Sequence, residues 1–130
     1  RARPVTRKAS SMAPAVLVVD DEADLLATYR RLLGRDGFRV VTAATREAAL
    51  RALEREAYAA AIVDVRLPDG DGLDVVRKAR EVAQPPPAIV VTGFPSKTMR
   101  KAALEAGAVD FVTKPFAAAA LAARVRALAR

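Results

Sequence analysis

Polar residues suited to metal or anion chemistry stand at the end of four apolar runs in this sequence. The runs and their polar residues are VLVVDD (16–21) with Asp20 and Asp21, AAIVD (60–64) with Asp64, AIVVTG (88–93) with Thr92, and DFVTKP (110–115) with Lys114. Buried parallel strands are apolar throughout, and open α/β sheets bind their ligands at the carboxyl ends of the strands. The pattern therefore predicts a functional site at one edge of a sheet.

The three carboxylates favour a site for a divalent cation. Asp20, Asp21 and Asp64 would repel one another at a separation of a few ångströms, and a cation relieves that repulsion. Mg²⁺ suits such a site because it takes only a few protein oxygens and keeps several waters, and Mn²⁺ is a second candidate. Capping of the next helix is the simpler role for Asp20 and Asp21, but the third acid on a neighbouring strand favours the metal.

Lys114 and Thr92 suit an added anion. The Lys114 ammonium could pair with the acids or with that anion, and the Thr92 hydroxyl could donate a hydrogen bond to it. A surface lysine and an ordinary strand-end threonine are the plain alternatives, but two such residues at strand ends facing the acids favour a site. The Lys114–Pro115 bond is a candidate for the cis form, although general frequencies favour trans, with cis at about 5–6% of such bonds.

The elements that position these residues alternate between strand and helix five times. We predict strands at 15–19, 38–42, 59–63, 88–92 and 109–113, and helices near 22–34, 45–56, 71–82, 96–106 and 116–129. Strict alternation with short connections predicts a parallel sheet covered by helices on both faces. Arg39 in the second strand indicates a sheet edge. We expect a flavodoxin-like, doubly wound α/β fold with five strands in the order 2-1-3-4-5.

Local signals place some side chains on these helices. Thr45 and Ser96 suit the N-caps of the second and fourth helices. In the last helix, Leu121, Val125 and Leu128 recur at the spacing of a buried stripe.

Composition limits the classes of function. The chain of 130 residues has no histidine and no cysteine, which excludes His-ligated zinc, Ser-His triads and disulfides. No apolar run approaches the roughly 20 residues of a membrane helix, and no secretory signal is present, so we expect a cytoplasmic protein without a membrane partner. Residues 1–14 read as a disordered basic lead-in, as an expression remnant or as a linker, and 15–130 as one domain.

The net charge of +7 raises the question of nucleic acid. Arg1, Arg3, Arg7 and Lys8 supply four of these charges, which leaves +3 for residues 9–130. The other basic residues are spread singly and are not interleaved with aromatics, so we do not expect direct nucleic-acid binding. A binder that works through the basic tail remains an alternative. A flavin carrier of the same topology is disfavoured, because the acids after the first strand would repel a flavin phosphate.

The same residues carry a resemblance to the response regulator receiver domain. The stretches LPDGDGLDVV (67–76) and EAGAVDFVTKPF (105–116) are similar to that family's third-strand loop and fifth-strand region, and the resemblance covers 15–130. It implies a two-component signalling module that accepts a phosphoryl group from a phosphohistidine of a sensor histidine kinase or phosphotransfer protein. It implies no enzyme activity beyond self phosphoryl transfer and slow autodephosphorylation. A phosphorylation-independent protein-binding module with the same fold is the alternative.

The resemblance also implies roles for the site residues. Asp64 would be the phosphoacceptor. Asp21 and Asp64 would bind Mg²⁺ directly, together with the backbone carbonyl of Arg66, and Asp20 would hold a metal-bound water. Thr92 and Lys114 would contact the phosphoryl oxygens, a role that suits phosphoryl transfer, which depends on positioning and charge neutralisation.

Signal output is expected on the surface of the fourth helix, fifth strand and fifth helix. By resemblance, phosphorylation pulls Thr92 inward and lets Phe111 rotate inward. Val109 and Ala120 stand where DNA-binding relatives often carry acids, so we expect an output partner of another kind or another mode of phosphorylation-dependent homodimer. Our further hypothesis is that Arg66 and Phe94, two residues after Asp64 and Thr92, hinder the attacking water and slow autodephosphorylation.

Overall fold

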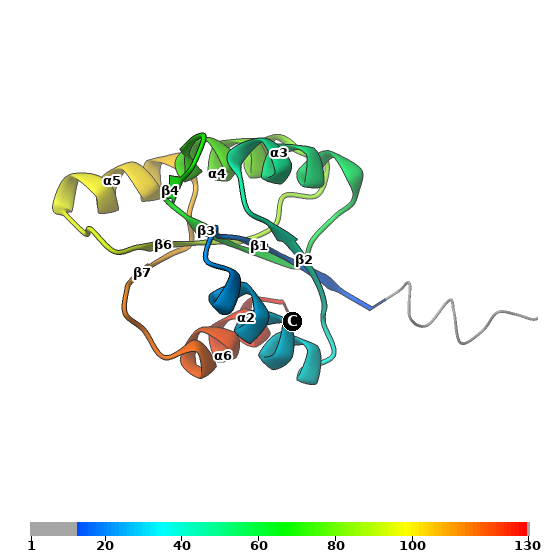
Figure 1. The fold of residues 1–130 in the computed structure, drawn as a ribbon. Helices are drawn as coiled ribbons and strands as arrows, with labels where there is room; N and C mark the ends of the chain where they lie inside the picture. The colour runs from blue at the N-terminus through cyan, green and yellow to red at the C-terminus, as the bar shows by residue number, and fades with distance from the viewer. Residues whose placement is uncertain (1–12, 130) are drawn as a thin grey trace, which may run out of the picture.

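A computed structural model of the protein describes residues 13–129. Five parallel strands form its sheet: β1 (Ala15–Val19), β2 (Arg39–Ala43), β3 (Ala60–Asp64), β6 (Ala88–Thr92) and β7 (Asp110–Thr113). They lie in the order β2-β1-β3-β6-β7 (Figure 1). This is the predicted 2-1-3-4-5 order, and the flavodoxin-like fold is confirmed. Most of the predicted lead-in lies outside the described residues.

Helices cover both faces of the sheet. The pair α2 (Ala23–Arg35) and α6 (Ala118–Leu128) lies on one face, and α3 (Arg46–Arg55), α4 (Gly72–Glu81) and α5 (Lys97–Ala106) lie on the other (Figure 1). The sheet contributes side chains to two hydrophobic cores, one on each face. Strand β1 is an example, because successive side chains of a strand point to opposite faces. Val16 and Val18 join the α2–α6 core, whereas Leu17 and Val19 join the core under α3, α4 and α5.

Strands β1, β3 and β6 are buried along their whole length, as expected for central strands. The edge strand β2 is only partly buried, and Arg39 is exposed. The residues at the carboxyl ends of the central strands are therefore held in place by a well-packed core.

The predicted helix caps are confirmed, but the predicted stripe of the last helix is partly wrong. Thr45 Oγ1 accepts a hydrogen bond from Ala48 N, and Ser96 Oγ accepts one from Met99 N. In α6, Leu121 and Val125 are buried, as expected. Leu128 is 37% exposed, because it is the last residue of the helix and no further helical turn packs beside it among residues 13–129.

A small hairpin between β3 and α4 was not predicted. It consists of β4 (Arg66–Leu67) and β5 (Gly70–Asp71), which pair antiparallel. Each strand has only two residues, too few to show a period in the sequence. Only Val65 separates the hairpin from Asp64, the last residue of β3, and the hairpin therefore lies beside the candidate site.

Among residues 13–129, no helix combines the length and the apolar character that a membrane crossing requires.

Candidate functional site

The three predicted acids meet at the carboxyl edge of the sheet. Asp20 and Asp21 follow β1, Asp64 ends β3, and these two strands are neighbours. One carboxylate oxygen from each residue lies within 4.8 Å of the others. Asp20 and Asp64 are buried, while Asp21 is exposed to solvent. The cluster thus has a buried floor and one acid at its rim.

Burial raises the pKa of Asp20 above its ordinary value, and the nearby Asp64 raises it further. The backbone N–H of Glu22, 2.9 Å from Asp20 Oδ1, and the Lys114 ammonium lower the pKa without offsetting the rise. Desolvation and like charge are the causes expected when carboxylates share a site. The folded site therefore disfavours the ionised form of Asp20.

Lys114 supplies the one cation that hydrogen-bonds to the cluster in the described structure. Its Nζ lies 2.9 Å from Asp64 Oδ2, 3.2 Å from Asp20 Oδ2 and 2.6 Å from Glu22 Oε1. An ammonium has three donors, so these contacts occupy all of them. Burial alone would lower the pKa of Lys114, but the bonds to Glu22 and Asp64 raise it above its usual value, and the lysine is charged. The Lys114–Pro115 peptide bond is cis, the form that general frequencies disfavoured.

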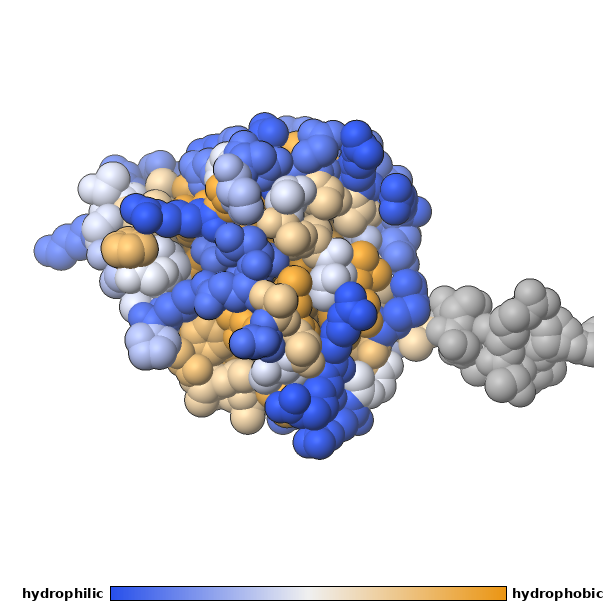
Figure 2. Space-filling model, in the orientation of Figure 1, coloured by the Kyte–Doolittle hydropathy of each residue, from blue (hydrophilic) through white to orange (hydrophobic). Residues whose placement is uncertain are grey.

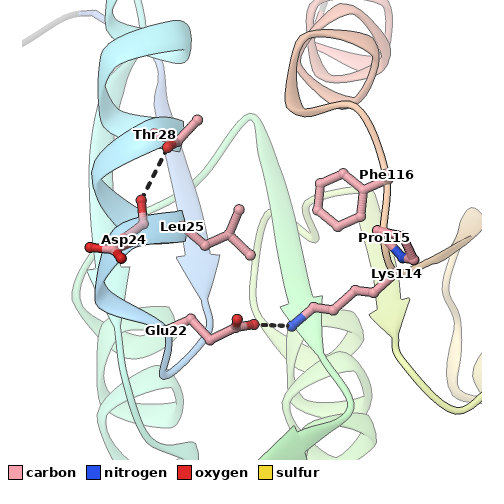
Figure 3. A pocket seen from close by; sticks show the side chains of 7 residues that line it. All are labelled: Glu22, Asp24, Leu25, Thr28, Lys114, Pro115 and Phe116. Carbon is pink, nitrogen blue, oxygen red and sulfur yellow. Dashed lines mark hydrogen bonds and ion pairs between the residues drawn. The ribbon is translucent and has the colours of Figure 1, made fainter.

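Glu22 is a site residue that the sequence analysis missed. It is the N-cap of α2, and its side chain reaches across to Lys114 (Figure 3). The signal was present in the sequence, since Glu22 directly follows Asp20 and Asp21. A third acid there reads equally well as a solvated residue in the first turn of a helix, and its side chain is in fact 58% exposed.

Thr92 is buried at the end of β6, the strand beside β3, and its side chain makes no hydrogen bond to Asp20, Asp21 or Asp64. Its hydroxyl accepts a hydrogen bond from the backbone N–H of Phe94 at 3.1 Å. Its backbone carbonyl accepts one from Lys114 N at 2.8 Å. The structure thus fixes Thr92 and Lys114 to each other through the backbone, with the threonine side chain turned to its own loop.

Arg66 and Phe94 contact each other. The Arg66 guanidinium carbon lies 4.1 Å from the centroid of the Phe94 ring, a cation–π geometry. Both side chains are exposed, and the Phe94 residue is 64% exposed. The Arg66 backbone N–H also donates to Asp64 Oδ1 at 3.0 Å. The two residues that were predicted to hinder the attacking water therefore contact each other beside Asp64.

Phe111 lies on β7 in a half-buried position and packs against the core under α3, α4 and α5. The Arg100 guanidinium of α5 lies 5.7 Å from the centroid of its ring. Val109, just before β7, is 53% exposed. The predicted switch residue is thus at the sheet edge farthest from β2 and in contact with α5.

A groove of about 520 Å³ adjoins the acid cluster between the start of α2 and the segment that follows β7 (Figure 3). Its lining residues are Glu22, Asp24, Leu25, Thr28, Lys114, Pro115 and Phe116. Figure 3 shows Glu22 and Lys114 meeting across the groove from opposite walls. The groove therefore gives solvent access to the lysine side of the site.

The donor set fits a hard divalent cation. The cluster offers carboxylate oxygens and no nitrogen or sulfur ligand, and the chain contains no histidine or cysteine. Mg²⁺ and Mn²⁺ accept such oxygen ligands. An ammonium beside the same carboxylates can neutralise an anion that arrives at them. The arrangement is suited to handling a phosphoryl group.

Comparison with known proteins agrees with this chemistry. The family model described as the response regulator receiver domain matches residues 16–126. The transcriptional regulatory protein PrrA of Mycobacterium tuberculosis is 42% identical over 118 residues, which cover 91% of this chain and 51% of PrrA. The response regulator MprA of Mycobacterium leprae is 39% identical over 115 residues, 88% of this chain and 50% of MprA. The chain spans about half the length of the curated relatives it matches.

Solved structures of receiver domains superpose closely. A CheY-like receiver domain protein from Methanospirillum hungatei JF-1 gives a TM-score of 0.84 at 29% identity, covering 90% of this chain and 94% of that one. The receiver domain of the sensor histidine kinase PA1611 from Pseudomonas aeruginosa PAO1 gives 0.78 at 29% identity, covering 90% and 98%, and holds a magnesium ion in its active-site cleft. The chain belongs to the response regulator receiver domain family of two-component signalling.

Proposed function

We propose that this receiver domain accepts a phosphoryl group on Asp64 from a phosphohistidine of a sensor histidine kinase or a phosphotransfer protein. The observation that carries the proposal is the position of Asp64: a buried carboxylate held by Lys114 at 2.9 Å and surrounded by two further acids. A carboxylate oxygen attacks phosphorus, the bond from phosphorus to the histidine nitrogen breaks, and an acyl phosphate forms on Asp64. Transfer of this kind needs positioning and charge neutralisation.

The chain's own residues supply much of the positioning and of the charge neutralisation. The Arg66 N–H holds Asp64 Oδ1 at 3.0 Å and Lys114 holds Oδ2, so the carboxylate is oriented before a donor arrives. Lys114 is charged and stands where the incoming phosphoryl oxygens need a counter-ion. The Thr92 hydroxyl would turn from its Phe94 N–H to donate to one of these oxygens. We assign to Thr92 and Lys114 the role of contacting the phosphoryl oxygens.

Asp21, Asp64 and the backbone carbonyl of Arg66 would hold Mg²⁺, with Asp20 acting through a bound water. When bound, the ion would neutralise the excess negative charge and stabilise charge on the transferred group. The acid cluster of the structure and the magnesium ion of the PA1611 receiver domain support this proposal. Mn²⁺ would serve in its place.

We further propose that the Arg66–Phe94 pair sets the lifetime of the phosphorylated state. Hydrolysis requires a water to reach the phosphorus atom beside Asp64. The stacked pair stands next to this carboxylate, with the guanidinium 4.1 Å from the ring centroid. Two side chains that hold each other in place obstruct water better than two that move independently, so autodephosphorylation is slow.

Output is proposed to pass through the surface formed by α5, β7 and α6. Thr92 and Phe111 are the proposed switch residues. A shift of α5 would cost little free energy, because this helix buries only small side chains, those of Ala103 and Ala106. Figure 2 shows apolar residues gathered at the lower left of the molecule, in the region of α6. Such a surface suits an apolar output partner or a phosphorylation-dependent homodimer. The name of PrrA makes a transcriptional output the first to test.

A phosphorylation-independent binding module is the competing function. It requires no acceptor chemistry, and all five predicted site residues are present in this chain. Incubation with acetyl phosphate and Mg²⁺, followed by digestion and mass spectrometry, separates the two. Phosphoryl transfer predicts a modified peptide that contains Asp64 and that disappears when Mg²⁺ is chelated. A binding module predicts no modified peptide.

A further inference from the structure

Asp69, in the turn of the β4–β5 hairpin, caps a helix that lies elsewhere in the chain. Its Oδ1 accepts a hydrogen bond from Arg46 N at 2.6 Å, and its Oδ2 accepts one from Glu47 N at 3.0 Å. These are the first two residues of α3, more than twenty positions earlier in the sequence. The same two bonds, that from Glu47 first, lower the pKa of Asp69, so the carboxylate is ionised.

Helix α3 already has a local cap. Thr45 Oγ1 accepts from Ala48 N at 3.1 Å, which satisfies the third N–H of the helix. A side-chain cap of this kind is the usual device at a helix start. Asp69 adds to it a connection that Thr45 cannot make: it ties the hairpin after β3 to the end of a separate helix.

Arg46 makes a second connection between α3 and the same segment. Its Nε donates to Asp74 Oδ2 of α4 at 2.9 Å. On the way its side chain crosses Gly70, where a Cβ atom would lie 2.7 Å from Arg46 Cδ. Gly70 also has a φ of 155°. The outer side of the hairpin is therefore held at Asp69 and covered at Gly70.

The inner side of the hairpin is fixed to the candidate site. Val65 N donates to Val91 O at 3.1 Å, and Arg66 N donates to Asp64 Oδ1 at 3.0 Å. Gly72 N closes the segment by donating to Val65 O at 2.6 Å. The carbonyl of Arg66, proposed above as a metal ligand, thus belongs to a hairpin anchored on both sides.

We propose that Asp69 is a positioning residue for the metal: by fastening the hairpin of residues 66–71 to the start of α3, it holds the Arg66 carbonyl in place at the acid cluster. The inference rests on the proposed role of that carbonyl as a Mg²⁺ ligand. Outer contacts of this type orient metal ligands, and their loss typically weakens metal affinity by about 10–100-fold. Without the anchor, Mg²⁺ binding must itself order the hairpin.

The test compares Asp69→Ala and Asp69→Asn with Thr45→Ala in the full chain. Thr45→Ala removes a cap from the same helix end but leaves the hairpin connection intact. Titration calorimetry with MgCl₂ at fixed pH gives the Mg²⁺ dissociation constant, and thermal unfolding gives the stability of each variant. We expect Asp69→Ala to weaken Mg²⁺ binding about tenfold, with a smaller effect for Asp69→Asn and no effect for Thr45→Ala. Equal Mg²⁺ affinities in all the variants would overturn the inference.

Hydrogen exchange of the metal-free proteins provides a second readout. Asp69→Ala should accelerate exchange of the amides of residues 66–72, whereas Thr45→Ala should affect only the first turn of α3. Unchanged hairpin exchange in Asp69→Ala would contradict the anchoring itself. If the parent protein binds no Mg²⁺, the proposed function fails and the metal role of Asp69 falls with it, while the exchange data still decide whether the anchor exists.

Discussion

Lys114 Nζ lies 2.9 Å from Asp64 Oδ2, an ion pair that joins residues 50 positions apart in the sequence. It connects the segment after β7 to the end of β3, two strands that are separated by β6 in the sheet. One ammonium faces the carboxylates of Asp20, Asp64 and Glu22 at this point. The site therefore holds more negative than positive charge when no metal is bound.

This imbalance predicts that Asp20→Asn stabilises the metal-free protein. The pKa of Asp20 is raised in the folded state, so its ionised form costs folding free energy, and this cost grows as the pH rises through the folded pKa. At neutral pH the neutral asparagine should raise the free energy of unfolding on the order of 1 kcal/mol, a shift of several degrees in Tm. Thermal unfolding in EDTA measures it.

Two controls sharpen this prediction. Millimolar Mg²⁺ should stabilise the parent more than Asp20→Asn, because the variant loses the carboxylate that would hold a metal-bound water, and the difference in Tm between the two proteins should shrink. Asp36→Asn removes a carboxylate paired with Arg126 outside the site, and it should not raise Tm. A Tm for Asp20→Asn below that of the parent in EDTA would contradict the claim that excess negative charge destabilises the metal-free site.

Replacement of Arg66 and Phe94 should shorten the phosphoryl lifetime. An exposed cation–π pair is worth about 0.5–1 kcal/mol, so loss of either partner should accelerate autodephosphorylation roughly two- to fivefold. In the double variant Arg66→Ala, Phe94→Ala, the acceleration of autodephosphorylation should not exceed the product of the accelerations in the two single variants. The decay of the phosphorylated protein, followed by mass spectrometry after removal of the donor, gives the half-lives. Arg77→Ala, a surface arginine on α4 outside this pair, serves as the control, and a double variant that decays like the parent would refute the lifetime proposal.

Gly72 should tolerate no side chain. A Cβ at this position would lie 1.9 Å from the Asp64 carbonyl oxygen, a backbone atom of the proposed phosphoacceptor. Gly72→Ala must displace β3 or the start of α4, and we expect a loss of about 2 kcal/mol or more in the free energy of unfolding. Gly34→Ala is the matched control, because Gly34 lies in α2 with no atom within 4 Å of an added Cβ. It should stabilise by about 0.5–1 kcal/mol, and urea unfolding of both variants checks the opposite signs.

Tyr29 and Tyr58 should respond in opposite directions to the same substitution. Tyr29 is buried, and its hydroxyl is the one buried side-chain polar atom of residues 13–129 without a hydrogen-bond partner. The Tyr58 hydroxyl is also buried but donates to Ala52 O at 2.9 Å. An unpaired buried hydroxyl costs about 1–3 kcal/mol, and a paired one contributes about 1 kcal/mol. Tyr29→Phe should therefore raise Tm and Tyr58→Phe should lower it; a lower Tm for Tyr29→Phe would show that its hydroxyl has a partner.

The fold and the core of the site were predictable because both depend on patterns along single strands. A buried strand shows as an apolar run, and its last residue must lie at the carboxyl edge whatever the loops do. That reasoning located Asp20, Asp64, Thr92 and Lys114 within one or two residues of the strand ends. The strand order followed from the alternation of strands and helices and from Arg39 in the edge strand.

The remaining features depend on contacts between segments that carry no local signal. Asp69 reads as an ordinary turn residue, and only the folded chain shows that it caps α3. Glu22 reads as a first-turn acid, and its contact with Lys114 arises because the segment after β7 returns to the start of α2. Leu128 has the spacing of a buried residue, but the helix ends there.

The most direct test of the central claim is intact-protein mass spectrometry after incubation with acetyl phosphate and Mg²⁺, run beside Asp64→Asn and a sample in EDTA. The account predicts one phosphoryl adduct on the parent with Mg²⁺, and none on Asp64→Asn or in EDTA. An adduct that persists on Asp64→Asn, or a parent that remains unmodified with Mg²⁺ present, would contradict Asp64 as a metal-dependent phosphoacceptor.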